Sequence, residues 1–144
     1  MSLDKQVGGG HYKALSVQPI TYIQSNKLDY CQGNVVKYVT RYPTKNGRED
    51  LEKAAHYCEF LLEYYTAHRW ARVVRYVTAH PLLLRLQIDP RKYCNVNTIQ
   101  GLPRKAIRLV STWRTLADLK EAKHCVLTQA QLEYGDNTHG AREA

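Results

Sequence analysis

The sequence predicts an all-α protein built on a helical hairpin, with a long third helix and a basic helical C-terminal extension. Apolar residues recur every three or four positions over residues 28–42, 48–80 and 103–133, which is the spacing of one face of an α-helix. Prolines and helix-capping residues fall near the ends of these segments. A chain of 144 residues is long enough to bury a core without disulfide bonds or a structural metal.

Two helices are expected before the first turn. Pro19 suits the first turn of a short helix. The second helix fits residues 28–42, and Pro43 ends it. Its apolar stripe consists of Leu28, Cys31, Val35, Val39 and Tyr42. Gly33 costs up to about 1 kcal/mol relative to alanine inside a helix, so we expect it to mark a close approach by another backbone or a ligand.

The third helix is expected to be unusually long. Asn46 is its predicted N-cap, with Glu49 as the partner in a capping box. The apolar pattern then continues to about His80, and Pro81 stops it. A helix of about 30 residues would be about 45 Å long, which exceeds the width of a compact domain. We therefore expect a break near His68, or a homo-oligomer in which this helix supplies part of the interface.

The remaining segments give weaker patterns. Residues 81–102 are ambiguous, because LLLRLQI fits either a helical turn or a short strand, and residues 91–102 are predicted to be a loop. A last helical region follows Pro103 and is expected to break near residues 111–115.

The chain is predicted to divide into three parts: a tail (1–10), a helical domain (11–66) and a basic extension (67–144). The net charge of +8 is concentrated in residues 67–114, which hold ten Lys or Arg and a single acid, Asp89. A segment of this charge favours an anionic partner, such as a nucleic acid, a nucleotide or an acidic protein surface.

Several other classes of protein are disfavoured. No run approaches the roughly 18 apolar residues of a membrane span, and the first residues lack the apolar stretch of a secretory signal, so we expect a cytoplasmic protein with no membrane partner. The four cysteines lack CxxC spacing and are expected to be reduced. The pairs His56/Cys58 and His124/Cys125 point in different directions on a helix, so neither a metal site nor a cysteine nucleophile is predicted.

Charged residues of the hairpin form the candidate site for a phosphate-bearing ligand. The second helix carries Asn34, Lys37 and Arg41 on one face, the third carries Asp50, Lys53 and Tyr57, and the turn adds Lys45. A short turn makes the two helices antiparallel, so these faces can flank one cleft. Arginine grips phosphate with two parallel hydrogen bonds, and a helix N-terminus also favours an anion. His11 and Tyr12 would cover the cleft as a lid. Surface charges on an ordinary hairpin would give the same pattern.

Several motifs in this region resemble the phage-associated SaV-like domain family over residues 8–66. The matching residues, in order, are His11-Tyr12, Gly33-Asn34, Lys37-Tyr38, Arg41, Lys45-Asn46, Glu49-Asp50-Leu51, Lys53-Ala54 and Tyr57. One coliphage member is a nucleotide kinase that acts on deoxynucleoside monophosphates without a P-loop, and this chain likewise lacks GxxxxGK[ST]. The resemblance implies nucleotide binding by a bacteriophage protein in the host cell cytoplasm.

The resemblance and the charge pattern together suggest three functions. The first is nucleotide kinase-like transfer of a phosphoryl group to a deoxynucleoside monophosphate, with Asp50 and Arg41 as catalytic candidates. In that function Lys37 and Lys53 would help to clamp phosphates, and Asp50, joined by Glu49, would hold Mg²⁺ or the acceptor. The second is non-catalytic sequestration of a nucleotide or a nucleotide-derived defence signal in the same cleft.

The third function is nucleic-acid binding by the basic C-terminal half. Its candidate patches are Arg69, Arg72 and Arg75 beside Trp70, and Arg104, Lys105 and Arg108 near Trp113. Binding of this kind should weaken steeply with salt. A solvated helix face or a subunit contact would show the same charge pattern.

Overall fold

The computed structural model describes residues 1–5, 7 and 9–135. Over these residues the chain forms seven α-helices, two short 3-10 helices and no strand, which confirms the all-α prediction. The α-helices are α1 (Pro19–Ser25), α2 (Tyr30–Arg41), α3 (Arg48–Ala67), α4 (Arg69–Thr78), α5 (Pro90–Val96), α6 (Gly101–Thr112) and α7 (Leu116–Tyr134). The 3-10 helices are η1 (Ser2–Asp4) and η2 (Tyr42–Thr44).

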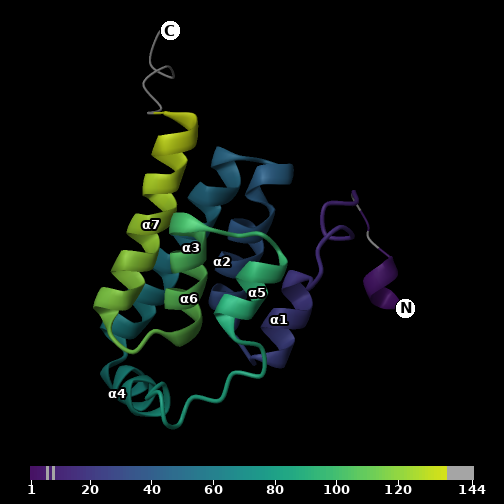
Figure 1. Cartoon of the computed structure of the whole chain (residues 1–144). Helices are drawn as coiled ribbons and strands as arrows, with labels where there is room; N and C mark the ends of the chain where they lie inside the picture. The colour runs from purple at the N-terminus through teal and green to yellow at the C-terminus, as the bar shows by residue number, and fades with distance from the viewer. Residues whose placement is uncertain (6, 8, 136–144) are drawn as a thin grey trace, which may run out of the picture.

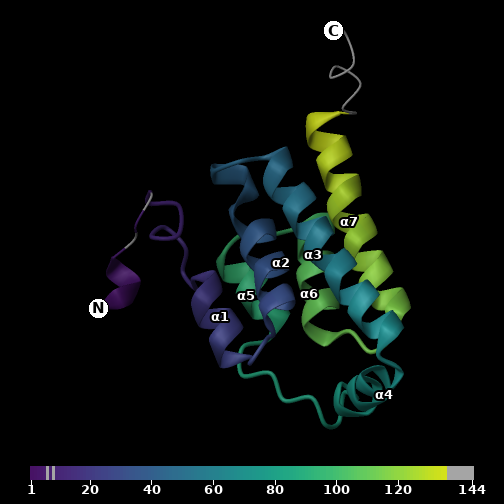
Figure 2. The same cartoon turned by 180° about the vertical axis from the view of Figure 1, so that it is seen from behind.

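Four helices form the centre of the fold. Helix α3 packs against α2 and α7, and α6 packs against α2 and α7, so that the four lie side by side (Figures 1 and 2). Helices α1 and α5 cover one side through α2 and α6, and α4 lies across one end of the bundle. None of the helices that the structure describes is both long and apolar enough to cross a membrane.

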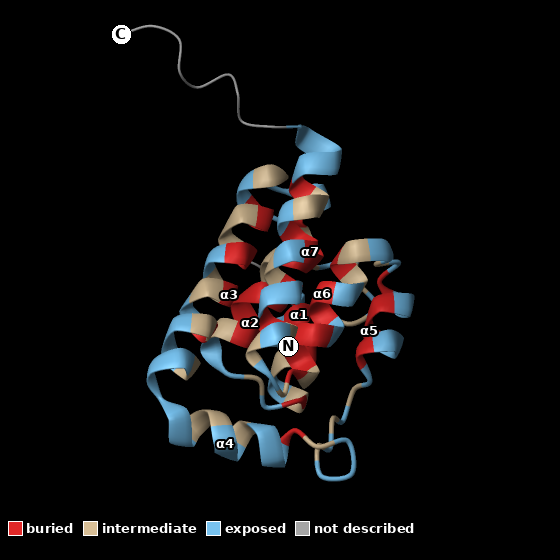
Figure 3. Cartoon of the chain, turned by 90° about the vertical axis from the view of Figure 1, so that its left-hand side faces the viewer, coloured by how far each residue is buried: buried red, intermediate tan, exposed pale blue. Residues whose placement is uncertain are grey.

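A single hydrophobic core joins the two halves of the sequence. Its largest buried apolar side chains are Tyr22, Val35, Val36, Val39, Leu51, Tyr93, Ile107, Val110, Trp113, Leu119 and Val126. The buried positions of α3, α6 and α7 face one another in the middle of the bundle (Figure 3). The basic extension therefore contributes α6 and α7 to the same core as the hairpin.

The break predicted near His68 in the third helical segment is present. Helix α3 ends at Ala67, and α4 begins at Arg69 in a different direction, so His68 is the joint between them (Figure 3). The break between α6 and α7 also agrees with the predicted position.

The loop predicted over residues 91–102 is wrong, because this range contains most of α5 and the start of α6. The Asp89 carboxylate accepts hydrogen bonds from the backbone N–H groups of Arg91 (2.6 Å) and Lys92 (3.3 Å), and Pro90 occupies the first helical position. An N-cap aspartate followed by proline is a strong start signal for a helix.

The predicted N-cap of the third helix is also wrong, by one residue. Gly47 occupies this position with φ 51° and ψ −121°, a conformation that side-chain-bearing residues rarely adopt. A Cβ atom on Gly47 would lie 3.1 Å from the ring of Tyr134 on α7. Asn46 instead donates to the Asp50 carboxylate (3.4 Å), and Glu49 pairs with Lys53.

Gly33 does mark a close approach, made by a side chain of the neighbouring helix. A Cβ on Gly33 would lie 3.0 Å from Cγ2 of Ile23, so the absence of a side chain lets α1 sit against α2.

Helix α2 begins at a capping box, in which the Asp29 carboxylate accepts from the Gln32 N–H (2.8 Å) and the Gln32 side chain accepts from the Asp29 N–H (3.0 Å).

Candidate phosphate-binding site

An ion pair between α2 and α3 lies at the centre of the candidate site. Arg41 donates from Nε to Oδ2 of Asp50 (2.9 Å) and from Nη2 to Oδ1 (3.0 Å). The Asp50 side chain is 0% exposed and that of Arg41 is 14% exposed. The hydrogen bond to Asp50 raises the pKa of Arg41. Because the enclosed carboxylate is occupied by Arg41 and Asn46, we assign Asp50 the role of holding Arg41 in place.

Three cations surround the ring of Tyr38, one turn before Arg41. Lys37 Nζ lies 4.2 Å from the ring centroid, Arg41 Cζ 4.8 Å, and Lys53 Nζ 5.8 Å. Tyr38 itself stacks on Tyr57, with centroids 5.9 Å apart and planes inclined by 19°. The ring of Tyr38 therefore interacts with cations from both helices.

Asn34 and Glu49 orient the two lysines. Asn34 is buried, donates to the Tyr30 carbonyl (2.8 Å) and accepts from Lys37 Nζ (2.7 Å). Lys53 pairs with Glu49 one turn earlier on α3, where both side chains are partly exposed. Asn34, predicted as a ligand contact, thus reaches the site through Lys37.

His11 and Tyr12 of the N-terminal segment lie near Arg41, at the end of the hairpin that carries the turn. Burial, followed by the positive charges of Lys45 and Arg41, lowers the pKa of His11. Burial raises the pKa of Tyr12, whose hydroxyl also interacts with Arg41. The two rings pack edge to face with centroids 4.2 Å apart. Both residues therefore lie beside the charges of the hairpin that they were predicted to cover.

We call this group the hairpin cluster: His11, Tyr12, Lys37, Tyr38, Arg41, Lys45, Asp50 and Lys53. It contains the predicted ligand contacts other than Asn34, and adds Tyr38, which the sequence indicated only as part of the motif shared with the family it resembles. The spacing Lys37-Tyr38-x-x-Arg41 carried that signal, because residues three apart on a helix are neighbours.

Metal ligands are scarce in the parts of the chain that the structure describes. No group of three or more His, Cys, Asp or Glu side chains there could hold a metal ion. All four cysteines are free, and burial raises the pKa of Cys58 to about 12 and that of Cys94 to about 11. Such thiols are protonated near neutral pH and are poor nucleophiles.

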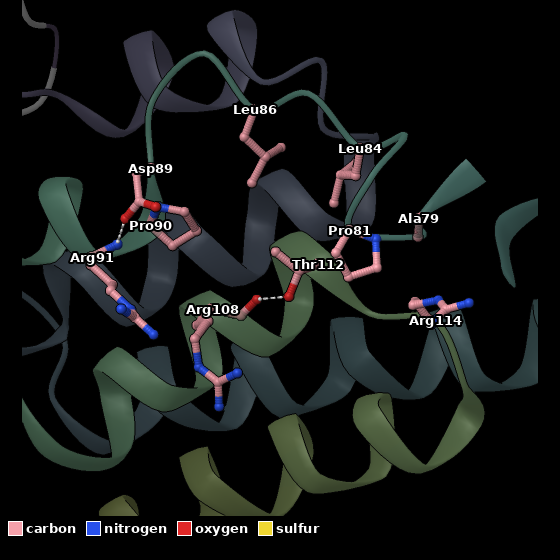
Figure 4. Close-up of a pocket in the computed structure, with 10 residues that line it drawn as sticks. All are labelled: Ala79, Pro81, Leu84, Leu86, Asp89, Pro90, Arg91, Arg108, Thr112 and Arg114. Carbon is pink, nitrogen blue, oxygen red and sulfur yellow. Dashed lines mark hydrogen bonds between the residues drawn. The ribbon is translucent and has the colours of Figure 1, made fainter. Parts of the chain in front are cut away.

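A second basic region borders a pocket of about 450 Å³ between α6 and the segment that leads into α5. Its lining combines Leu84, Leu86, Pro81 and Pro90 with Arg91, Arg108 and Arg114. Figure 4 shows the guanidinium groups of Arg91 and Arg108 extending in the same direction beside Pro90.

Several residues of the two patches predicted to bind nucleic acid make hydrogen bonds or ion pairs within the chain instead. Arg75 turns inward, donates from Nε to the Trp113 carbonyl (2.9 Å), and lies over the Trp113 ring at 4.9 Å. Burial lowers the pKa of Arg75. Trp113 is itself buried, Arg104 donates to Asn95 (2.7 Å), and Lys105 pairs with Glu121.

Fold and site together define an all-α helical bundle that carries a cation-rich cluster at the turn of its α2–α3 hairpin. Residues 8–59 match the model of a family described as a protein of unknown function (DUF3310). Comparisons with curated proteins and with solved structures found no match. The matched range contains α1, α2 and the first part of α3, and with them the whole hairpin cluster.

Proposed function

We propose that this chain binds a nucleotide through its phosphate at the hairpin cluster. The observation that carries the proposal is the gathering of Lys37, Arg41 and Lys53 around one tyrosine ring, with Arg41 already held by a buried carboxylate. A side chain that is ordered before binding loses less entropy when the ligand arrives. The resemblance to the SaV-like family, whose coliphage member acts on nucleotides, supports a nucleotide and a bacteriophage setting.

Two uses of the bound nucleotide fit the cluster. Transfer of a phosphoryl group to a deoxynucleoside monophosphate requires mainly positioning and neutralisation of charge, which the cations supply. Sequestration without chemistry is favoured by the enclosure of Asp50, because a buried, paired carboxylate is poorly placed to hold Mg²⁺ or to accept a proton. Kinase-like transfer would then rely on Arg41 and the lysines, with Mg²⁺ bound chiefly through phosphate oxygens.

The experiment is a calorimetric titration with deoxynucleoside mono-, di- and triphosphates and cyclic nucleotides, each with and without Mg²⁺. Every ligand that binds is then incubated with the protein, with a nucleoside triphosphate as donor, and the products are separated. New phosphorylated product identifies the kinase, and an unchanged bound ligand identifies sequestration. An absence of binding by every nucleotide would refute the proposal.

Replacing both Lys37 and Lys53 with glutamine is expected to weaken nucleotide binding about 100-fold, because each charge-assisted contact contributes about 1.5 kcal/mol. Both side chains are partly exposed, so the melting temperature should change little. The matched control is Lys92→Gln with Lys120→Gln, which removes the same charge from exposed positions elsewhere. Equal affinities for the two double variants would contradict this placement of the ligand.

His11 is expected to make anion binding depend on pH. Its pKa lies below the ordinary 6.5 because of burial and nearby cations, so the ring gains a positive charge only in mildly acidic solution. Affinity for sulfate, which stays a dianion, should rise as the pH falls from about 8 to about 5. By linkage, the lowered pKa makes the same protonation destabilise the unliganded fold below pH 6.5.

The measurement is a sulfate titration at several pH values on the wild type and on His11→Gln. The variant should show a flatter pH profile and a similar affinity at the alkaline end. Parallel profiles for the two proteins would show that another group causes the pH dependence.

A further inference from the structure

Helix α4 presents its apolar face to solvent. Trp70, Val73, Val74 and Val77 recur at helical spacing, and we call them the α4 ridge. Trp70 is 83% exposed, and each of the three valines is at least half exposed. An amphipathic helix ordinarily turns such a stripe towards a core. Figure 3 shows α4 lying across the end of the bundle with no other helix beyond it.

The opposite side of α4 is fixed to the body of the protein. Arg75 donates to the carbonyls of Trp113 (2.9 Å) and Ser111 (3.4 Å), and Arg114 lies over the ring of Tyr76 at 4.3 Å. These contacts hold the helix by its polar side. The α4 ridge therefore points away from its own chain and cannot reach its own bundle without breaking them.

An apolar groove that could receive the α4 ridge runs between the start of α2 and the second half of α3. It encloses about 790 Å³ and is lined by the rings of Tyr30, Tyr57, Phe60, Tyr64 and Tyr65, together with Leu61, Cys31 and Asp29. Tyr30 is 75% exposed, and Phe60 and Tyr64 are about half exposed. We call this surface the aromatic groove. Both surfaces are apolar, and each lacks a cover within the described chain.

The charges around the two surfaces are opposite. Helix α4 carries no acid; Arg69 is exposed, Arg72 is half-buried, and Arg75 turns inward to the carbonyls of Trp113 and Ser111. The lining of the aromatic groove contains one carboxylate, Asp29, which also interacts electrostatically with Arg75 of its own chain, and no basic residue. Glu63 is exposed on α3. Contact between two α4 ridges would instead bring together Arg69 of both copies, which lies beside Trp70, and this contact between like charges costs free energy. The charges therefore favour the contact of ridge with groove.

We infer that two copies of this chain form a reciprocal dimer in which the α4 ridge of each copy occupies the aromatic groove of the other. The two contacts are related by a two-fold axis, so the assembly closes. The aliphatic and indole side chains would cover Tyr30, Phe60 and Tyr64, and Arg69 would approach the carboxylates beside the groove. The hairpin cluster lies on the other side of Tyr57 and is not required for this contact.

Sedimentation equilibrium on the full chain tests the dimer. The wild type should be dimeric, and two variants should be monomeric: Trp70→Ser with Val74→Lys on the ridge, and Phe60→Lys with Tyr64→Lys in the groove. All four substituted side chains are exposed, so each variant should keep the wild-type helical circular dichroism spectrum. A ridge variant and a groove variant that stay as dimeric as the wild type would overturn the inference.

Mixing the two variants distinguishes reciprocal exchange from other contacts. In the mixture, the intact ridge of the groove variant can occupy the intact groove of the ridge variant, so one of the two contacts is restored and a heterodimer should form. If two α4 helices contacted each other instead, the groove variant would remain dimeric. Mixing the two variants would then produce no association beyond that of each variant alone. A dimeric groove variant would overturn the reciprocal dimer. A monomeric wild type would also overturn it, including a wild type in which Trp70 binds anionic lipid vesicles instead.

Discussion

Replacing Asp50 with alanine is expected to destabilise the fold by about 3 kcal/mol, because it removes one partner of a buried ion pair and leaves Arg41 without its carboxylate. The Asp50 side chain is 0% exposed and accepts two hydrogen bonds from the Arg41 guanidinium. Its loss also removes a buried contact between α2 and α3. Chemical denaturation of the variant and the wild type measures this difference.

The control is the double variant Arg41→Met with Asp50→Leu. Replacement of a buried ion pair by apolar residues of similar volume is often neutral for stability, so the double variant should recover most of the loss. It should still fail to bind nucleotide, because Arg41 is gone. A single Asp50→Ala variant as stable as the wild type would show that the pair contributes little to the fold.

Replacing Trp113 with alanine is expected to cost about 3–5 kcal/mol, the usual range for removing a large buried aromatic side chain. Trp113 is fully enclosed at the end of α6 and packs edge to face on Tyr65, with centroids 4.4 Å apart. Its indole N–H has no hydrogen-bond partner among the described residues, so the loss is one of packing. Arg75 would also lose the ring beneath it, and amide exchange in α4 should become faster.

The second tryptophan supplies the control for this experiment. Trp70 is 83% exposed, and Trp70→Ala should change the stability of the monomer by less than about 0.5 kcal/mol. Both variants are measured at a concentration at which the wild type is monomeric. Similar losses for the two variants would contradict the contrast in burial between these tryptophans.

The length and periodicity of the long helices made them predictable. Helix α5 was missed because it is short and shows no clear periodicity. Helix α5 buries only Pro90, Tyr93 and Cys94, which is too few positions to establish a period of 3.6 residues. Its N-cap, Asp89, and its first residue, Pro90, are both visible in the sequence. A cap signal is local, so it can mark a helix whose buried face is too short to recognise.

Much of the candidate site was predictable, because helical spacing places Lys37 and Arg41 on one face of α2 and a short turn makes α3 antiparallel to it. The burial of Asp50 was not, since aspartate is almost always exposed unless it is paired. The inward turn of Arg75 likewise depends on carbonyls 36 and 38 residues away. Contacts of that range leave no local trace in the sequence.

The most direct test of the central claim is a titration of the isotope-labelled protein with a deoxynucleoside monophosphate, followed by ¹H–¹⁵N NMR. The account predicts that the largest shift changes fall on amides of residues 37–53 and on those of His11 and Tyr12. Shift changes confined to Arg91 and Arg108, or no changes at all, would contradict the assignment of the hairpin cluster as the phosphate-binding site.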